Sequence, residues 1–210
     1  MNRIENEFEA RKKKILKSAK KLFIKYGFDN VSLNQIAKDA DFGKSTLYYY
    51  FSSKNEILYV IVRQYDLSRL KKSEVAFNKA LGSYDKIYSY LKEYYNFVKV
   101  NNRALFMLTN RNVQLIYRDI IPNLSSELIE TYERHFVKSA EDLKEQLKLG
   151  EQDGYFTKIK DKHIQLAYIM LTTRSVISFL FHDHYTLNHL TEEEIDRYFE
   201  IHLNIILKNL

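Results

Sequence analysis

The chain has 210 residues, with one proline, five glycines, no cysteine and a net charge of +6 at pH 7. Proline and glycine are too rare here to end the many strands and hairpins of a β architecture. The composition therefore predicts an all-α protein. The lack of cysteine excludes disulfides and thiol chemistry and fits a reducing cytoplasm; with no apolar core in the first residues and no run of about 20 apolar residues, we expect neither a signal peptide nor a membrane partner.

The first predicted helix covers about residues 9 to 26. Its apolar side chains recur at a spacing that places them on one helix face: Ile15, Ala19, Leu22, Phe23 and Tyr26. We expect this face to hold a small helical head together.

Residues 31 to 58 carry the signals of two short helices and the start of a third. Ser32 with Gln35 and Ser53 with Glu56 have the spacing of capping boxes, in which each side chain satisfies an amide of the other residue. Between them the periodicity breaks, and we expect Gly43 to let the backbone turn before a helix over Lys44 to Tyr50. The pattern predicts a helix-turn-helix, with Leu47 and Phe51 inside.

Residues 10 to 60 resemble, in order and spacing, the amino-terminal domain of the TetR family of transcriptional regulators. The matching positions are Leu22 to Phe28, Ile36-Ala37, Lys44 to Tyr48, Phe51 and Lys54. Asp41 stands where members usually carry glycine, and Gly43 stands where a serine or threonine usually caps the recognition helix. Aspartate tolerates a left-handed backbone and glycine is an acceptable weaker cap, so the fold is expected to survive both.

Charge supports a nucleic-acid partner for this segment. The first 60 residues hold twelve lysines and arginines against seven acidic residues, which leaves one net positive charge for the rest of the chain. Taken alone, Arg11 to Lys14 would be a solvated helix face. Beside a helix-turn-helix, the same charges are what phosphate attraction requires.

Position along the predicted helices assigns the expected DNA contacts. Lys44, Ser45 and Tyr49 are expected to touch base edges, and Thr46 a base methyl or a phosphate. Tyr48, Tyr50, Lys54 and the amides at Ser32 and Leu33 are expected to hold phosphates. For Tyr48 and Tyr50 the alternative is packing within the head.

Six further helices are predicted, at about 53–75, 83–100, 103–118, 124–149, 161–184 and 191–209, the last opened by a capping box of Thr191 with Glu194. We expect a DNA-binding helix-turn-helix domain over 1–53. A larger helical effector-binding and dimerisation domain should cover 54–210.

The helix near 161–184 is apolar on nearly all sides, so it should be buried all round. One small domain cannot easily enclose it. Together with the apolar stripe of the last helix, which includes Ile206, it predicts a four-helix homodimer interface. The resemblance implies the same interface, and a buried monomer core is the alternative.

The resemblance also implies a helical pocket for a small-molecule effector. Its expected lining is bulky and mostly apolar: Tyr94, Phe97, Phe106, Met107, Tyr132, Phe136 and Met170. Each of these could instead be plain core. Arg174 demands a partner on its apolar helix, either an anionic ligand or a carboxylate of the facing subunit.

The expected function is a ligand-responsive repressor, released from its double-stranded DNA operator by an apolar or amphipathic effector. A DNA-binding dimer without an effector, or an activator, stays open. No cofactor is expected, and no enzyme, because phosphate loops, nucleophile elbows and paired histidines are absent. His182-Asp183-His184 suggests a metal, but side chains two apart on a helix point to different sides.

Overall fold

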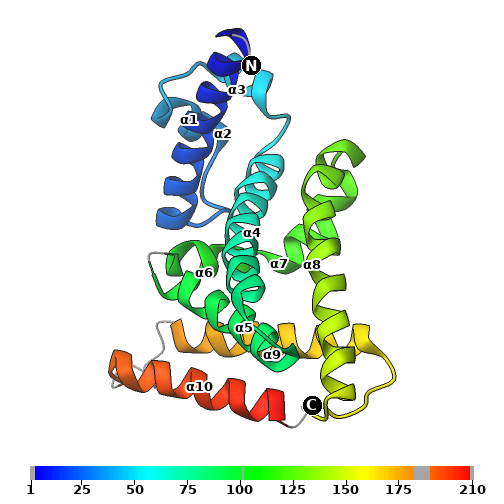
Figure 1. Ribbon diagram of the computed structural model, residues 1–210. Helices are drawn as coiled ribbons and strands as arrows, with labels where there is room; N and C mark the ends of the chain where they lie inside the picture. The colour runs from blue at the N-terminus through cyan, green and yellow to red at the C-terminus, as the bar shows by residue number, and fades with distance from the viewer. Residues whose placement is uncertain (1–2, 101, 182–189, 209–210) are drawn as a thin grey trace. The chain divides into compact units, whose positions relative to one another are not determined.

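The computed structural model describes residues 3–100, 102–181 and 190–208, and within these ranges all regular structure is helical, as predicted. Figure 1 traces the helices along the chain. The residues form two compact units, one of Met1–Asp66 with Leu108–Ile129 and one of Leu67–Met107 with Glu130–Leu210. The expected domain boundary after residue 53 stays a prediction.

The first unit begins with the predicted three-helix head, formed by α1 (Arg3–Tyr26), α2 (Leu33–Asp39) and α3 (Lys44–Tyr50), and α4 (Lys54–Lys79) starts in the same unit. Helix α2 contacts both α1 and α3. The residues that fill the head are fully or almost fully buried: Ile15, Ala19, Phe23, Ile36, Leu47 and Phe51. This confirms the predicted apolar face of the first helix with one exception. Tyr26 is 49% exposed, because the helix ends there and the chain leaves through Gly27, whose φ is +82°.

The helix predicted over 103–118 is wrong as a single element. Helix α6 (Arg103–Arg111) ends before Asn112, and α7 (Val113–Leu115), the short π-helix η1 (Ile116–Ile120) and the 3₁₀ helix η2 (Ile121–Asn123) follow. The Leu108 carbonyl accepts from the Asn112 side chain at 2.8 Å and also from the Asn112 amide at 3.3 Å. The side chain and the backbone of Asn112 therefore share one acceptor at the point where α6 ends, an arrangement that weakens a helix locally.

The second unit contains α5 (Ser83–Lys99), α9 (Lys162–Phe181), α10 (Glu192–Lys208) and most of α8 (Ser126–Gln152), which enters this unit at Glu130. These helices confirm four predicted ones to within a few residues. Helices α5, α9 and α10 contact one another. At their centre the Tyr95 ring stacks on Phe199 at 4.2 Å and on Phe181 at 5.5 Å.

Helix α9 is buried on one face and exposed on another within the chain, so the cover of its second face by another subunit stays a prediction. Ile169 and Ile177 are fully buried, whereas Ile164 and Leu171 on another face are 63% and 64% exposed. By length and composition alone, α9 is also the one helix among the described residues that could cross a membrane. Its buried face packs against α5 and α10.

Candidate functional site

Helix α2 begins with the predicted capping box. The Gln35 amide donates to Ser32 Oγ at 3.3 Å, and the Ser32 amide donates to Gln35 Oε1 at 2.7 Å. The Ser32 amide, expected to hold a phosphate, therefore already has an acceptor. Leu33, also expected at a phosphate, is half-buried at the first helical position.

The turn between α2 and α3 depends on Asp41 rather than on Gly43. Asp41 has the left-handed φ of +53°, and its carboxylate accepts from Lys14 Nζ at 2.9 Å. Gly43 has φ −70° and ψ 157°, which any residue adopts, and it supplies no side-chain cap to α3. The expected role of Gly43 in the turn is therefore wrong, while the tolerance of aspartate for a left-handed backbone is confirmed.

Helix α3 buries one face and exposes the other. Leu47 is fully buried and Phe51 is 1% exposed, as predicted. Lys44, Ser45 and Tyr49 are exposed, and Thr46 is half-buried. With Tyr49 75% exposed, the structure brings the expected base-reading side chains onto one free surface.

An aromatic cluster joins α3 to the start of α1, and sequence reasoning missed it. The Phe8 ring lies 4.7 Å from the Tyr50 ring and 5.9 Å from the Tyr49 ring, measured between centroids, and the two tyrosines are 5.2 Å apart. Tyr50 therefore packs within the head, whereas Tyr48 is 47% exposed with Lys44 Nζ 5.8 Å from its ring. Phe8 lies seven residues before Ile15, two helical turns along the same face, which is the signal that could have revealed it.

Lys54 ties the start of α4 to the loop after α1. Its Nζ donates to the carbonyl of Phe28 at 2.9 Å and lies 4.3 Å from the centre of the Phe28 ring. Ser53 Oγ accepts from the Glu56 amide at 3.1 Å, but the Glu56 carboxylate accepts from the Ser52 amide, so the predicted reciprocal capping box is wrong in its second half. An ammonium has three donors, which leaves Lys54 a donor for a phosphate.

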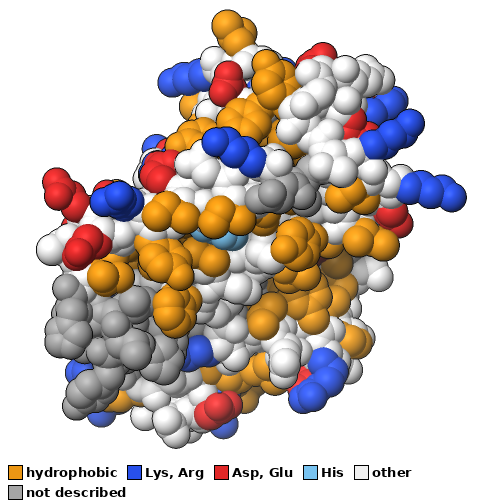
Figure 2. Space-filling model, turned by 90° about the horizontal axis from the view of Figure 1, so that it is seen from below, with side chains coloured by type: hydrophobic (Ala, Val, Ile, Leu, Met, Phe, Trp, Pro, Cys, Tyr) orange, Lys and Arg blue, Asp and Glu red, His pale blue; other side chains and the backbone are white. Residues whose placement is uncertain are grey.

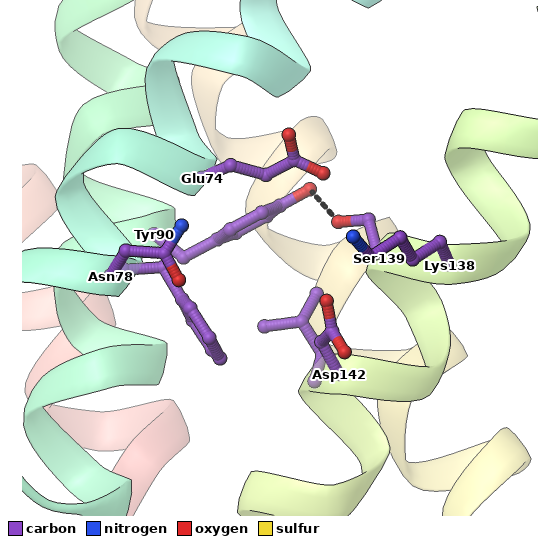
Figure 3. Close-up of a pocket in the computed structure, with 8 residues that line it drawn as sticks. Glu74, Asn78, Tyr90, Lys138, Ser139 and Asp142 are labelled. Atoms are coloured by element: carbon purple, nitrogen blue, oxygen red, sulfur yellow. Dashed lines mark hydrogen bonds between the residues drawn. The ribbon is translucent and has the colours of Figure 1, made fainter.

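The residues expected to line an effector pocket fall into two groups. Tyr94 and Phe106 are buried with their ring centroids 6.4 Å apart, and the Arg174 guanidinium lies 5.9 Å from the Phe106 ring. The others are half-buried on their helices: Phe97, Met107, Tyr132, Phe136 and Met170. The cavity drawn in Figure 3 is lined by none of the expected residues, but by polar and apolar side chains of α4, α5 and α8 that the sequence did not single out.

Helices α9 and α10 share an exposed apolar surface. Figure 2 shows hydrophobic side chains gathered there. Their exposed members are Ile164, Tyr168, Leu171, Phe179, Tyr198, Ile201 and Ile205. Between the two helices lies a groove of about 490 Å³ that includes Leu171 and His202. Burial lowers the pKa of His202, whose ring nitrogen lies 3.3 Å from Thr173 Oγ1, so the neutral imidazole is favoured on this surface.

The suggested metal ligands His182, Asp183 and His184 lie outside the described residues. In the ranges that the structure does describe, no group of three or more histidine or carboxylate side chains is placed to hold a metal ion.

Residues 15–60 match the model of a family described as bacterial regulatory proteins, tetR family. An HTH-type transcriptional regulator of Staphylococcus aureus (strain USA300) is 36% identical over 53 residues. That stretch is 25% of this chain and 29% of the curated relative, so the match covers less than a third of the relative's length.

Solved structures share the fold over nearly the whole chain. PfmR of Thermus thermophilus, a TetR family transcriptional regulator, is similar with a TM-score of 0.62 and 21% identity over 93% of this chain and 98% of that one. FadR of Bacillus subtilis in complex with stearoyl-CoA has a TM-score of 0.67 at 16% identity, covering 94% and 97%. AibR in complex with isovaleryl coenzyme A and operator DNA has 0.66 at 15%, covering 95% and 100%.

Proposed function

Because this chain belongs to the TetR family of bacterial regulatory proteins, we propose that it is a cytoplasmic, dimeric repressor that leaves its operator when a small effector binds. The observation that carries the proposal is the free surface of α3, where Lys44, Ser45 and Tyr49 project from a helix anchored by buried Leu47. A recognition helix reads bases with side chains placed in this way.

Lys44, Ser45 and Tyr49 then contact base edges, while Thr46, Tyr48 and Lys54 contact the backbone or a base methyl. Tyr50 serves mainly as packing, because its ring lies against Phe8. The test is fluorescence anisotropy on labelled DNA from upstream of the gene, compared with scrambled DNA. Tyr49→Ala should lose about 1 to 3 kcal/mol of discrimination at particular base pairs.

Tyr26→Ala is the matched control, since Tyr26 is also an exposed tyrosine of the head but lies at the end of α1. If Tyr49→Ala loses no more discrimination between operator and scrambled DNA than Tyr26→Ala does, α3 does not read the bases.

For the effector, we propose an amphipathic molecule with an acyl chain. Two proteins of similar fold are described in complex with acyl-CoA ligands, and Tyr94 and Phe106 offer buried aromatic surface in the second unit of this chain. A ligand that favours the released state by about 1 to 3 kcal/mol weakens operator binding by about 5- to 150-fold, and operator must weaken the ligand equally. Titrating acyl-CoAs of increasing chain length with and without operator tests this reciprocity. A ligand whose affinity ignores the DNA is not the effector of a switch.

For the homodimer, we propose the apolar surface of α9 and α10 as the interface. The exposed leucine and isoleucine side chains on it would lose their contact with water in a two-fold pairing.

A further inference from the structure

A polar cavity of about 130 Å³ lies among α4, α5 and α8 (Figure 3). Its inner wall is buried and mixed in character, with the apolar side chains of Phe77 and Leu143 beside the hydroxyls of Tyr90 and Ser139. Its rim consists of Glu74 and Asn78 from α4 and of Lys138 and Asp142 from α8. All eight residues belong to the second unit.

The two hydroxyls in the wall keep hydrogen-bonding capacity for a guest. Tyr90 is 3% and Ser139 4% exposed, and the one hydrogen bond between them is long, at 3.4 Å. Two hydroxyls carry two donors and four acceptor sites, so one shared bond leaves most of that capacity unused. Figure 3 shows the Glu74 carboxylate and the Tyr90 hydroxyl directed into the same space. The wall can therefore offer hydrogen-bonding groups to a polar guest beyond the bond that the two hydroxyls share.

The charged side chains of the rim determine which charge a bound molecule should carry. Within the described part of the chain, neither the Glu74 nor the Asp142 carboxylate has a hydrogen-bond or ion-pair partner. Lys138 is one turn before Asp142 on α8 and forms no ion pair with it, and the Lys86 ammonium already lies 5.5 Å from the centre of the Phe77 ring. Among the residues that line the cavity, two carboxylates stand against the one lysine, Lys138, so the lining itself carries a net negative charge, which favours a cation.

We propose that this cavity binds a small organic cation, an alkylammonium group whose chain lies on Phe77 and Leu143. Its three N–H donors are directed to the Glu74 and Asp142 carboxylates and to a hydroxyl oxygen of the wall. A cavity of about 150 Å³ takes a six-carbon ring, so about 130 Å³ accommodates five or six non-hydrogen atoms. The proposal goes beyond DNA regulation and does not require that the head bind DNA.

The test is an NMR titration of the full chain with n-butylammonium, which has five non-hydrogen atoms, beside its neutral and anionic counterparts n-butanol and butyrate. We expect saturable shifts for the amides of Ser139 and Asp142 with the cation only. Glu74→Gln and Asp142→Asn should each weaken binding about tenfold, since each removes a charge-assisted hydrogen bond. Added salt should weaken it further.

Glu141→Gln is the matched control, because Glu141 is the neighbour of Asp142 on α8 but is exposed and paired with Lys144. It should leave the affinity unchanged, and Lys138→Met should leave it unchanged or raise it. Equal binding of n-butanol, or unaltered affinity in both Glu74→Gln and Asp142→Asn, overturns the proposal. Both variants alter solvent-accessible rim carboxylates, so the fold is retained and either result is decisive.

Discussion

Leu171→Glu tests the proposed dimer interface without disturbing the subunit. Leu171 is 64% exposed on α9 and lines the groove between α9 and α10. Burying a whole leucine contributes about 1.5 to 3 kcal/mol, so covering the exposed part contributes about 1 to 2 kcal/mol. A two-fold interface uses each residue twice, which gives about 2 to 4 kcal/mol per dimer, or about a 30- to 1000-fold change in the dimer dissociation constant. Desolvation of the glutamate adds to this loss.

Sedimentation equilibrium across the micromolar range measures that dissociation constant, and circular dichroism verifies that the monomer stays helical. Val137→Glu is the matched control, because Val137 is 61% exposed but lies on α8. Ile206 is a poor target, since it is only 6% exposed within its own subunit and a charge there would unfold the chain. A Leu171→Glu protein that dimerises as tightly as the Val137→Glu control refutes the assignment of the interface.

Three further predictions concern the aromatic cluster, the glycines and the ion pairs of the second unit. Phe8→Ala should lower operator discrimination about 3- to 10-fold with an unchanged salt slope in anisotropy titrations, because Phe8 fixes the Tyr49 ring, while Phe8→Tyr should retain it. Gly150→Ala should lose about 1 to 3 kcal/mol in urea unfolding, because its Cβ would lie 2.3 Å from the Phe156 ring, whereas Gly43→Ser should gain a few tenths from a side-chain cap. The Arg103 and Lys99 side chains lower the pKa of Glu192. Burial raises the pKa of Asp196, but hydrogen bonds from Lys99 and Tyr95 lower it more. Both carboxylates therefore stabilise the folded chain at pH values above their ordinary pKa values of 4.5 and 3.8, and this stability is lost as the pH falls through their lower pKa values in the folded chain. Lys99→Met should flatten this decline in thermal melts below about pH 4.5, and an unaltered slope would show that the pairs do not contribute.

Local rules made the head largely predictable from the sequence. The Ser32 capping box, the left-handed Asp41 and the inward Leu47 each depend on a few neighbouring residues and on helical periodicity. The errors arose where two local options compete: Asn112 could continue a helix or take its carbonyl, and Glu56 could reach Ser53 or Ser52. A single sequence does not rank such close alternatives.

Contacts across the chain were less accessible. Phe8 packs on Tyr50 across 42 positions of sequence, and the cavity of Figure 3 unites Glu74, Tyr90 and Asp142 from three helices. Periodicity shows which face of a helix is apolar, but not which faces of separate helices meet. For that reason the sequence predicts an effector lining of bulky apolar side chains and gives no indication of the polar cavity.

The hydropathy of helix α9 indicates that its faces are covered, but not by what. Its sequence predicts burial on every side, with one face covered by a second subunit, and within the single subunit Ile169 is fully buried while Leu171, two positions on, is 64% exposed. An apolar helix of this length is compatible with a protein core or a membrane, and its exposed side chains are also compatible with the surface of a second subunit. The packing of α9 distinguishes these environments. Because α5 and α10 cover one face of the helix, only a stripe of apolar side chains on the opposite face stays exposed. We therefore propose that a second copy of the chain covers this stripe, since each subunit would then supply the apolar surface that the other needs.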